Sequence, residues 1–111
     1  MNVNPIIIAG LASLGLPIEP DHYEGDSTDY ITFVYADERP DVFADDTDTF
    51  DITSMQIHYF TKSDPEDNIK AIRRLLRVVG FAISNTQRFY EDDTGYNHIV
   101  VECWIDGEIE D

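Results

Sequence analysis

Hydrophobic residues recur at helical spacing in two segments of the chain. The first covers residues 4–14, with Pro5 suited to the first turn and Gly15 permitting the left-handed backbone that often ends a helix. The second begins at Asp64, the expected N-cap, and ends at Gly80. Its apolar positions fall on one helical face, namely Ile69, Ile72, Leu75, Leu76 and Val79. The pattern predicts two helices that can pack on a sheet.

Four segments have the composition of β-strands. Residues 30–36, 50–61, 82–90 and 98–105 are rich in aromatic and β-branched residues. In two of them apolar and polar positions alternate, which is typical of a half-buried strand. The apolar positions of these two segments are Met55, Ile57, Tyr59, Ile99, Val101, Cys103 and Ile105. We therefore expect one face of each strand to line the core.

Two less regular segments complete the predicted fold. Residues 18–23 form a weaker strand, and Pro20 suits the edge of a sheet. Residues 37–49 carry six acidic residues and are too long for a tight hairpin, so an extended acidic arm is predicted. The element order is α-β-β-β-α-β-β. It predicts a single domain over residues 1–111, an α+β two-layer sandwich in which a mainly antiparallel sheet packs against two helices.

The charge balance excludes several classes of function. The chain has 23 acidic and 7 basic residues, giving a formal net charge of −16. Such a surface repels phosphate, which argues against direct nucleic-acid binding and against binding to anionic membranes. The apolar run 6–16 is too short to span a bilayer and lacks a preceding positive region, so a buried helix is expected. One cysteine, Cys103, excludes an intrachain disulfide and suits a reducing compartment such as the cytoplasm.

No motif for catalysis, cofactor binding or metal binding is found. Carboxylates at 45, 46, 48 and 51 resemble calcium ligands, but the glycine and glutamate of an EF-hand loop are missing. His22, His58 and His98 are scattered along the sequence without zinc-ligand spacing. Cys103 alternates with Ile and Val and is interpreted as a core residue. We expect no enzyme activity, no cofactor and no metal.

The basic residues are concentrated on the second helix. Lys70, Arg73, Arg74 and Arg77 lie there, and two interpretations stay open. The cations can complement the helix dipole, or they can meet the acidic arm of an identical neighbour in a head-to-tail contact that closes into a ring or grows as a filament. The predicted interface residues are Arg39, Val42, Phe43, Asp45, Asp46, Arg73, Arg74 and Arg77.

Several segments together carry a family resemblance. They are NPIIIAGL at 4–11, HYEGD at 22–26, FVYADERP at 33–40, FADDTD at 43–48, QIHYFTK at 56–62, IRRLLRVVGF at 72–81 and FYEDDTGYNHIVVE at 89–102. With this element order, the chain resembles the tail terminator (tail-completion) proteins of long-tailed bacteriophages and prophages. The resemblance implies a hexameric ring that caps the tail tube, ends its polymerisation and joins the tail to the head connector.

The same resemblance implies partners and a location. The partners are further copies of the chain, the tail tube protein and head-completion or connector proteins, without cofactor or enzymatic activity. The location is the tail of the virion, and the host cytoplasm during assembly. DNA would pass through the ring without specific binding, and carboxylates facing the lumen would repel it. Alternatives are another neck, head-tail joining or minor tail component, an acidic DNA mimic that inhibits a nucleic-acid enzyme, and a small hydrolase.

Overall fold

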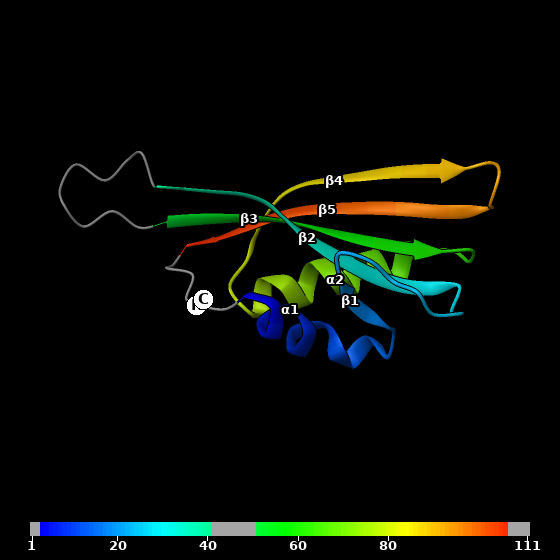
Figure 1. Ribbon diagram of the computed structural model, residues 1–111, viewed down its shortest axis with the longest axis horizontal. Helices are drawn as coiled ribbons and strands as arrows, with labels where there is room; N and C mark the ends of the chain where they lie inside the picture. Colours follow the sequence, from blue (N-terminus) through cyan, green and yellow to red (C-terminus); the bar gives the residue numbers. More distant parts are fainter. Residues whose placement is uncertain (1–2, 41–50, 107–111) are drawn as a thin grey trace.

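The chain folds into a sheet with two helices on one side. The computed structural model describes residues 3–40 and 51–106. Its elements are α1 (Val3–Leu11), a 3-10 turn η1 (Ala12–Leu14), β1 (Ile18–Pro20), β2 (Asp29–Pro40), β3 (Asp51–Thr61), α2 (Glu66–Val78), β4 (Ala82–Glu91) and β5 (Tyr96–Asp106). Both helices lie below the sheet in Figure 1, and its other face is free of described helices. This confirms the predicted α+β two-layer sandwich and its element order.

The five strands are ordered β1-β2-β3-β5-β4. Three of the four pairings are antiparallel, as expected. β1 pairs with β2 in parallel, with Ile18 opposite Ile31. This parallel pair was not predicted, because a three-residue strand leaves no periodic pattern in the sequence. Pro20 ends β1 at the edge of the sheet, where its missing N–H costs no ladder bond.

β2 is longer than the sequence predicts. The expected strand ended at residue 36, but pairing with β3 continues until Pro40 lies opposite Asp51. A bulge between Tyr35 and Asp37 takes up one extra residue and lets the ladder resume beyond it. The first four residues of the predicted acidic arm therefore belong to a strand. The rest of the arm, with residues 41–50, lies outside the described residues.

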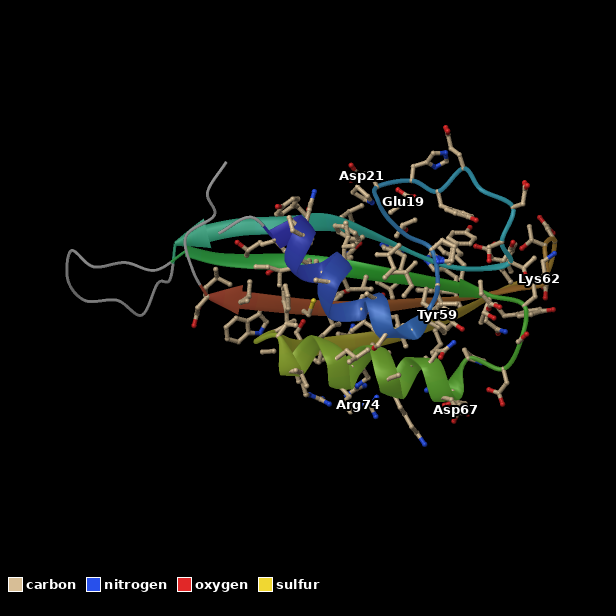
Figure 2. All side chains as sticks on the ribbon, turned by 90° about the horizontal axis from the view of Figure 1, so that it is seen from below. Glu19, Asp21, Tyr59, Lys62, Asp67 and Arg74 are labelled. Carbon is tan, nitrogen blue, oxygen red and sulfur yellow. The ribbon has the colours of Figure 1, made fainter. Side chains whose placement is uncertain are left out.

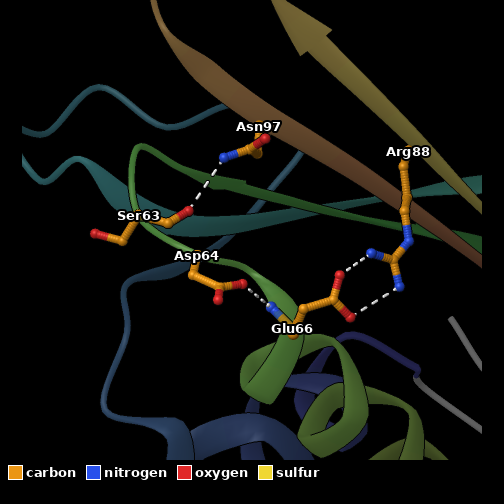
Figure 3. A network of polar contacts seen from close by, with 5 residues as sticks. All are labelled: Ser63, Asp64, Glu66, Arg88 and Asn97. Atoms are coloured by element: carbon orange, nitrogen blue, oxygen red, sulfur yellow. Dashed lines mark hydrogen bonds and ion pairs between the residues drawn. The ribbon is translucent and has the colours of Figure 1, made fainter.

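Glycines and a carboxylate define the helix ends. Gly15 adopts φ 72° and Gly80 φ 111°, so both act as the predicted helix terminators. Helix α2 begins at Glu66, two residues after the expected cap. The N-cap position is held by Pro65 rather than the expected Asp64, but Asp64 Oδ1 still accepts a hydrogen bond from the Glu66 N–H, the first of the helix, at 3.0 Å (Figure 3).

The core fills the space between the helices and the sheet. Fully buried side chains come from α1, α2 and the inner positions of β2, β3 and β5, including Ile7, Leu11, Ile31, Phe33, Met55, Ile57, Tyr59, Ile72, Leu76, Val101 and Cys103. Burial raises the pKa of the Cys103 thiol to about 12, which keeps it protonated and confirms it as a core residue. Leu75 is only partly buried, at the margin of the apolar face.

Candidate functional site

Aromatic rings line up across the uncovered side of the sheet, here called the open face. The register places Tyr30 of β2 opposite Phe60 of β3, and Phe60 opposite His98 of β5. On the edge strand β4, Phe89 lies opposite His98. Four strands therefore each contribute one ring to the same row. Side chains at such paired positions on one face are close enough to interact directly.

Most of these rings are stacked. The ring centroids of Tyr30 and Phe60 are 4.8 Å apart, and those of Phe60 and His98 are 4.2 Å apart, with interplanar angles of 19° in both pairs. Tyr23, from the β1–β2 connection, stacks on Tyr30 at 4.4 Å. These separations match the spacing of neighbouring strands, about 4.8 Å. Tyr23, Tyr30, Phe60 and His98 therefore form one continuous stack of partly buried rings, which we call the aromatic column.

Further rings close the sides of the aromatic column. Tyr96 meets Tyr30 and Phe60 edge to face, with interplanar angles of 72° and 89°. The ammonium of Lys62 lies 5.0 Å from the centroid of the Tyr96 ring, a cation–π contact. Phe89 is tilted by 49° against His98 and is 51% exposed. The open face is thus aromatic, partly exposed and able to hold a cation.

His58 and His98 form a hydrogen-bonded pair beside the aromatic column. His58 Nε2 donates to Gln56 Oε1 at 3.1 Å, so Nδ1 of the neutral His58 ring is an acceptor. His98 Nε2 lies 2.8 Å from that Nδ1 and donates to it. The remaining nitrogen, His98 Nδ1, lies 3.8 Å from Glu91 Oε2. The first proton that the pair accepts therefore binds to His98 Nδ1, where a carboxylate faces it.

Burial shifts the protonation equilibria on this face. It lowers the pKa of His58, and the neighbouring His98 lowers it further. Burial also lowers the pKa of His98, whereas Glu91 opposes this shift. The pKa of Tyr30 is raised by burial and by the nearby Tyr96 and Glu91. All three groups are therefore held in their neutral forms, which suits a stack of uncharged rings.

Local sequence positions the outermost ring of the aromatic column. Tyr23 Oη accepts a hydrogen bond from the Ser27 N–H at 2.9 Å, which bends the β1–β2 connection around the ring. Gly25 packs directly against the same ring, and a Cβ at this position would overlap the Tyr23 hydroxyl. Asp21, at the start of the connection, adopts φ 65°, a left-handed conformation that Asp tolerates better than most residues.

Two hollows flank Tyr23 at this edge of the sheet. One, of about 300 Å³, is lined by Glu19, His22, Tyr23, Glu24 and Gly25. The other, of about 150 Å³, is lined by Asp21, His22, Tyr23, Tyr30, Thr32 and Phe60. Both combine aromatic rings with carboxylates. Glu19 and Glu24 line the first hollow and Asp21 lines the second, and with the nearby Asp26 these exposed acids are called the acidic rim.

The predicted basic helix face is only partly free. Arg73 Nη1 donates to Thr86 Oγ1 of β4 at 3.0 Å, so this guanidinium is engaged within the subunit. Arg74 and Arg77 are exposed, as is Lys70. Arg88 of β4, which the sequence did not single out, forms a bidentate ion pair with Glu66 of α2 (Figure 3). These contacts hold α2 over β4.

The charges of α2 also complement its helix dipole. Its first turn carries the acids Glu66 and Asp67, and its last turn carries the cation Arg77.

The remaining predicted interface residues belong to the acidic arm. Val42, Phe43, Asp45 and Asp46 lie outside the described residues, and Arg39 is described only as a backbone position of β2, opposite Ile52. The predicted contact between the arm and the basic helix face is therefore untested.

Sequence reasoning missed the histidine pair and the aromatic column. His58 and His98 are 40 residues apart, and only the β3–β5 register brings them together; His22 lies apart from them. A usable signal did exist, because Tyr30, Phe60, His98 and Phe89 all occupy outward positions of predicted strands. Within the described residues, no group of three or more His, Cys, Asp or Glu is placed to hold a metal ion. Nor does any described helix have the length and apolarity needed to cross a bilayer.

Comparison with known proteins identifies a shared fold. No family model and no curated protein matches the chain. Among solved structures, it is similar to a chain described as part of the virion of a native gene transfer agent particle, with a TM-score of 0.59. The match covers 87% of this chain and 82% of that chain at 12% sequence identity. At this identity the likeness shows that the two chains share a fold.

Proposed function

We propose that this chain is a structural protein of a phage-related virion. The observation that carries the proposal is the fold it shares with a chain of a gene transfer agent virion, over 87% of its length. The sequence resemblance to tail terminator proteins, reached from different observations, favours the same class. The partners of such a protein are other structural proteins of the particle.

Within this class, we propose the role of tail terminator. In that role the chain forms a ring, most simply a hexamer, that caps the tail tube and joins the tail to the head connector. The formal charge of −16 supports a role at a DNA passage, because carboxylates repel phosphate and keep the passage free of binding. The exposed rings of the open face support assembly, because partly exposed aromatic surfaces are common in protein interfaces.

Electron microscopy of the purified protein, combined with sedimentation velocity, tests the proposal. Both are run from dilute to concentrated protein and across salt concentration, because self-repulsion between acidic subunits weakens as salt screens it. Rings with a central hole support the terminator role. A compact dimer, or a monomer under every condition including incubation with tail tubes, contradicts it.

The same preparations distinguish the alternatives. Another neck or minor tail component would bind particle proteins without ending tube growth, so tube length in a polymerisation assay separates it from a terminator.

A DNA mimic would compete with DNA for a nucleic-acid enzyme. That alternative is weakened by the exposed cations Lys70, Arg74 and Arg77 on α2, which interrupt a continuous acidic surface.

A further inference from the structure

One long side of the molecule carries acidic side chains, whereas the other carries the exposed cations of α2 together with Asp67 from the first turn of that helix. Glu19 and Asp21 lie along one side in Figure 2, whereas Arg74 lies along the other. The topology explains this separation, since β1 forms one edge of the sheet and β4 the other. Helix α2 is held over β4 by the contacts of Arg73 and Glu66 with that strand. The acidic rim and the basic residues of α2 therefore face away from each other within one subunit.

The acidic side is shaped to receive a cation. No Lys or Arg occurs between residues 18 and 38. The histidine in this segment is His22, whose Nε2 lies 3.7 Å from Glu24 Oε1. The larger hollow brings Glu19 and Glu24 together with the Tyr23 ring. A guanidinium can stack on an aromatic ring while its N–H groups bond to carboxylates, a combination that an ammonium matches less well. The chemistry of the hollow thus favours arginine.

The opposite side offers arginine side chains that have no partner among the described residues. Lys70, Arg74 and Arg77 are spaced four and three residues apart, so they lie along one face of α2, and we call them the basic flank. Unlike those of Arg73 and Arg88, the side chains of Arg74 and Arg77 form no hydrogen bond or ion pair with any described residue. Val78, next to Arg77, is 75% exposed, so an apolar side chain accompanies the cations.

We propose that the basic flank of one copy docks on the acidic rim of the next, with Arg74 or Arg77 entering the hollow beside Tyr23. The occupant is a second copy of this chain, because each copy carries both complementary surfaces on opposite sides. A contact between two different surfaces is heterologous. It forms a closed ring when the rotation that relates one copy to the next completes a full turn after a whole number of copies. This inference rests on the proposed ring and names the two surfaces that form it, within the described residues.

Charge reversal tests the contact. One variant combines Glu19→Lys with Glu24→Lys and reverses the rim; another combines Arg74→Glu with Arg77→Glu and reverses the flank. Each variant presents like charges at its own contact, so self-association should weaken by about tenfold or more. A 1:1 mixture restores both contacts, because each variant's rim then complements the other's flank. Its mean formal charge equals the wild-type −16, since the changes of +4 and −4 cancel.

The control separates local from overall charge. Asp92→Lys with Asp93→Lys, in the exposed β4–β5 turn, makes the same change of +4 as the rim variant. Because it reduces self-repulsion, this control should assemble at least as well as wild type. All of the substituted side chains are exposed, and urea unfolding checks that each variant is folded.

The outcomes separate this contact from the ring itself. Sedimentation velocity and electron microscopy should show rings for the wild type, the control and the mixture, and smaller species for each reversed variant. If the reversed variants form rings as readily as wild type, the contact is overturned while the terminator role stands. If each reversed variant fails and the mixture also fails, the rim and flank do not meet and the contact is likewise overturned. If the wild type forms no rings under any condition, including incubation with tail tubes, both the role and the contact are overturned.

Discussion

On the helix-covered face of the sheet the side chains are mostly aliphatic and fully buried, whereas on the open face they are rings in partial contact with solvent. Ile57 and Val101 are 0% exposed between the sheet and the helices. Phe60 and His98, on the same two strands, are only partly buried and stack on each other. The covered face depends on filling space between layers, and the open face depends on ring contacts between adjacent strands. Mutations on the two faces should therefore differ in cost.

The largest effect is expected on the covered face. Leu76 of α2 is fully buried, so Leu76→Ala removes apolar contacts and leaves a cavity, with an expected loss of about 2–5 kcal/mol in the free energy of unfolding. Urea titration followed by circular dichroism measures it. Val78→Ala is the matched control, because Val78 lies on the same helix but is 75% exposed and should change stability by about 0.5 kcal/mol or less. Equal losses for the two variants would show that α2 packs through a different face.

The open face should respond to a lost ring with a smaller cost. Phe60 lies between Tyr30 and His98, so Phe60→Ala removes its close stacked contacts with these two rings. Each aromatic pair contributes about 0.5–1.5 kcal/mol beyond area burial, so a loss of about 1–3 kcal/mol is expected. Phe89→Ala, at the exposed end of the row, is the control and should cost less. If Phe89→Ala is the more costly change, the stacking does not stabilise the open face.

The difference between the faces also explains what the sequence predicted. Apolar alternation in residues 55–59 and 99–105, and the helical spacing from Ile69 to Leu76, record contact with the core directly. These patterns predicted the layers, the element order and the burial of Cys103. The bulge after Tyr35 and the parallel β1 were not predictable in this way, because each depends on how the backbone pairs with a neighbour.

The candidate site was harder to predict than the fold. The aromatic column and the His58–His98 pair depend on the register between strands, which hydrophobic patterning does not specify for the outer face. The basic flank was visible in the sequence, because Lys70, Arg74 and Arg77 stand out in an acidic chain. The acidic rim was not, since its acids resemble the many others until the fold sets them around Tyr23.

A pH titration sharpens the comparison at the histidine pair. Burial lowers the pKa of both His58 and His98, so the folded state favours their neutral forms. Their contribution to stability is present above the unfolded pKa of about 6.5 and declines as pH falls from there toward the lowered folded values. His58→Gln should reduce this decline, measured as the difference in urea midpoint between about pH 8 and about pH 5.5. His22→Gln, at a side chain that is 74% exposed, is the control. If stability falls as much in His58→Gln as in the wild type, the fall arises from other titratable groups.

The smallest effect is expected where the helix layer meets the edge of the sheet. The side chains of Glu66 and Arg88 are about half exposed, and the hydrogen bond from Arg88 lowers the pKa of Glu66 (Figure 3). A carboxylate with a lowered folded pKa stabilises above its unfolded pKa, and this contribution is lost as pH falls through the folded value. Arg88→Gln should therefore shift the urea midpoint slightly at neutral pH, by less than Phe60→Ala does, and not at a pH where Glu66 is protonated in both states. Arg74→Gln, which removes an exposed cation from the same helix layer, controls for overall charge. A shift for Arg88→Gln that exceeds the Phe60→Ala loss would mean that this ion pair, rather than the ring stacking, holds the outer strands in place.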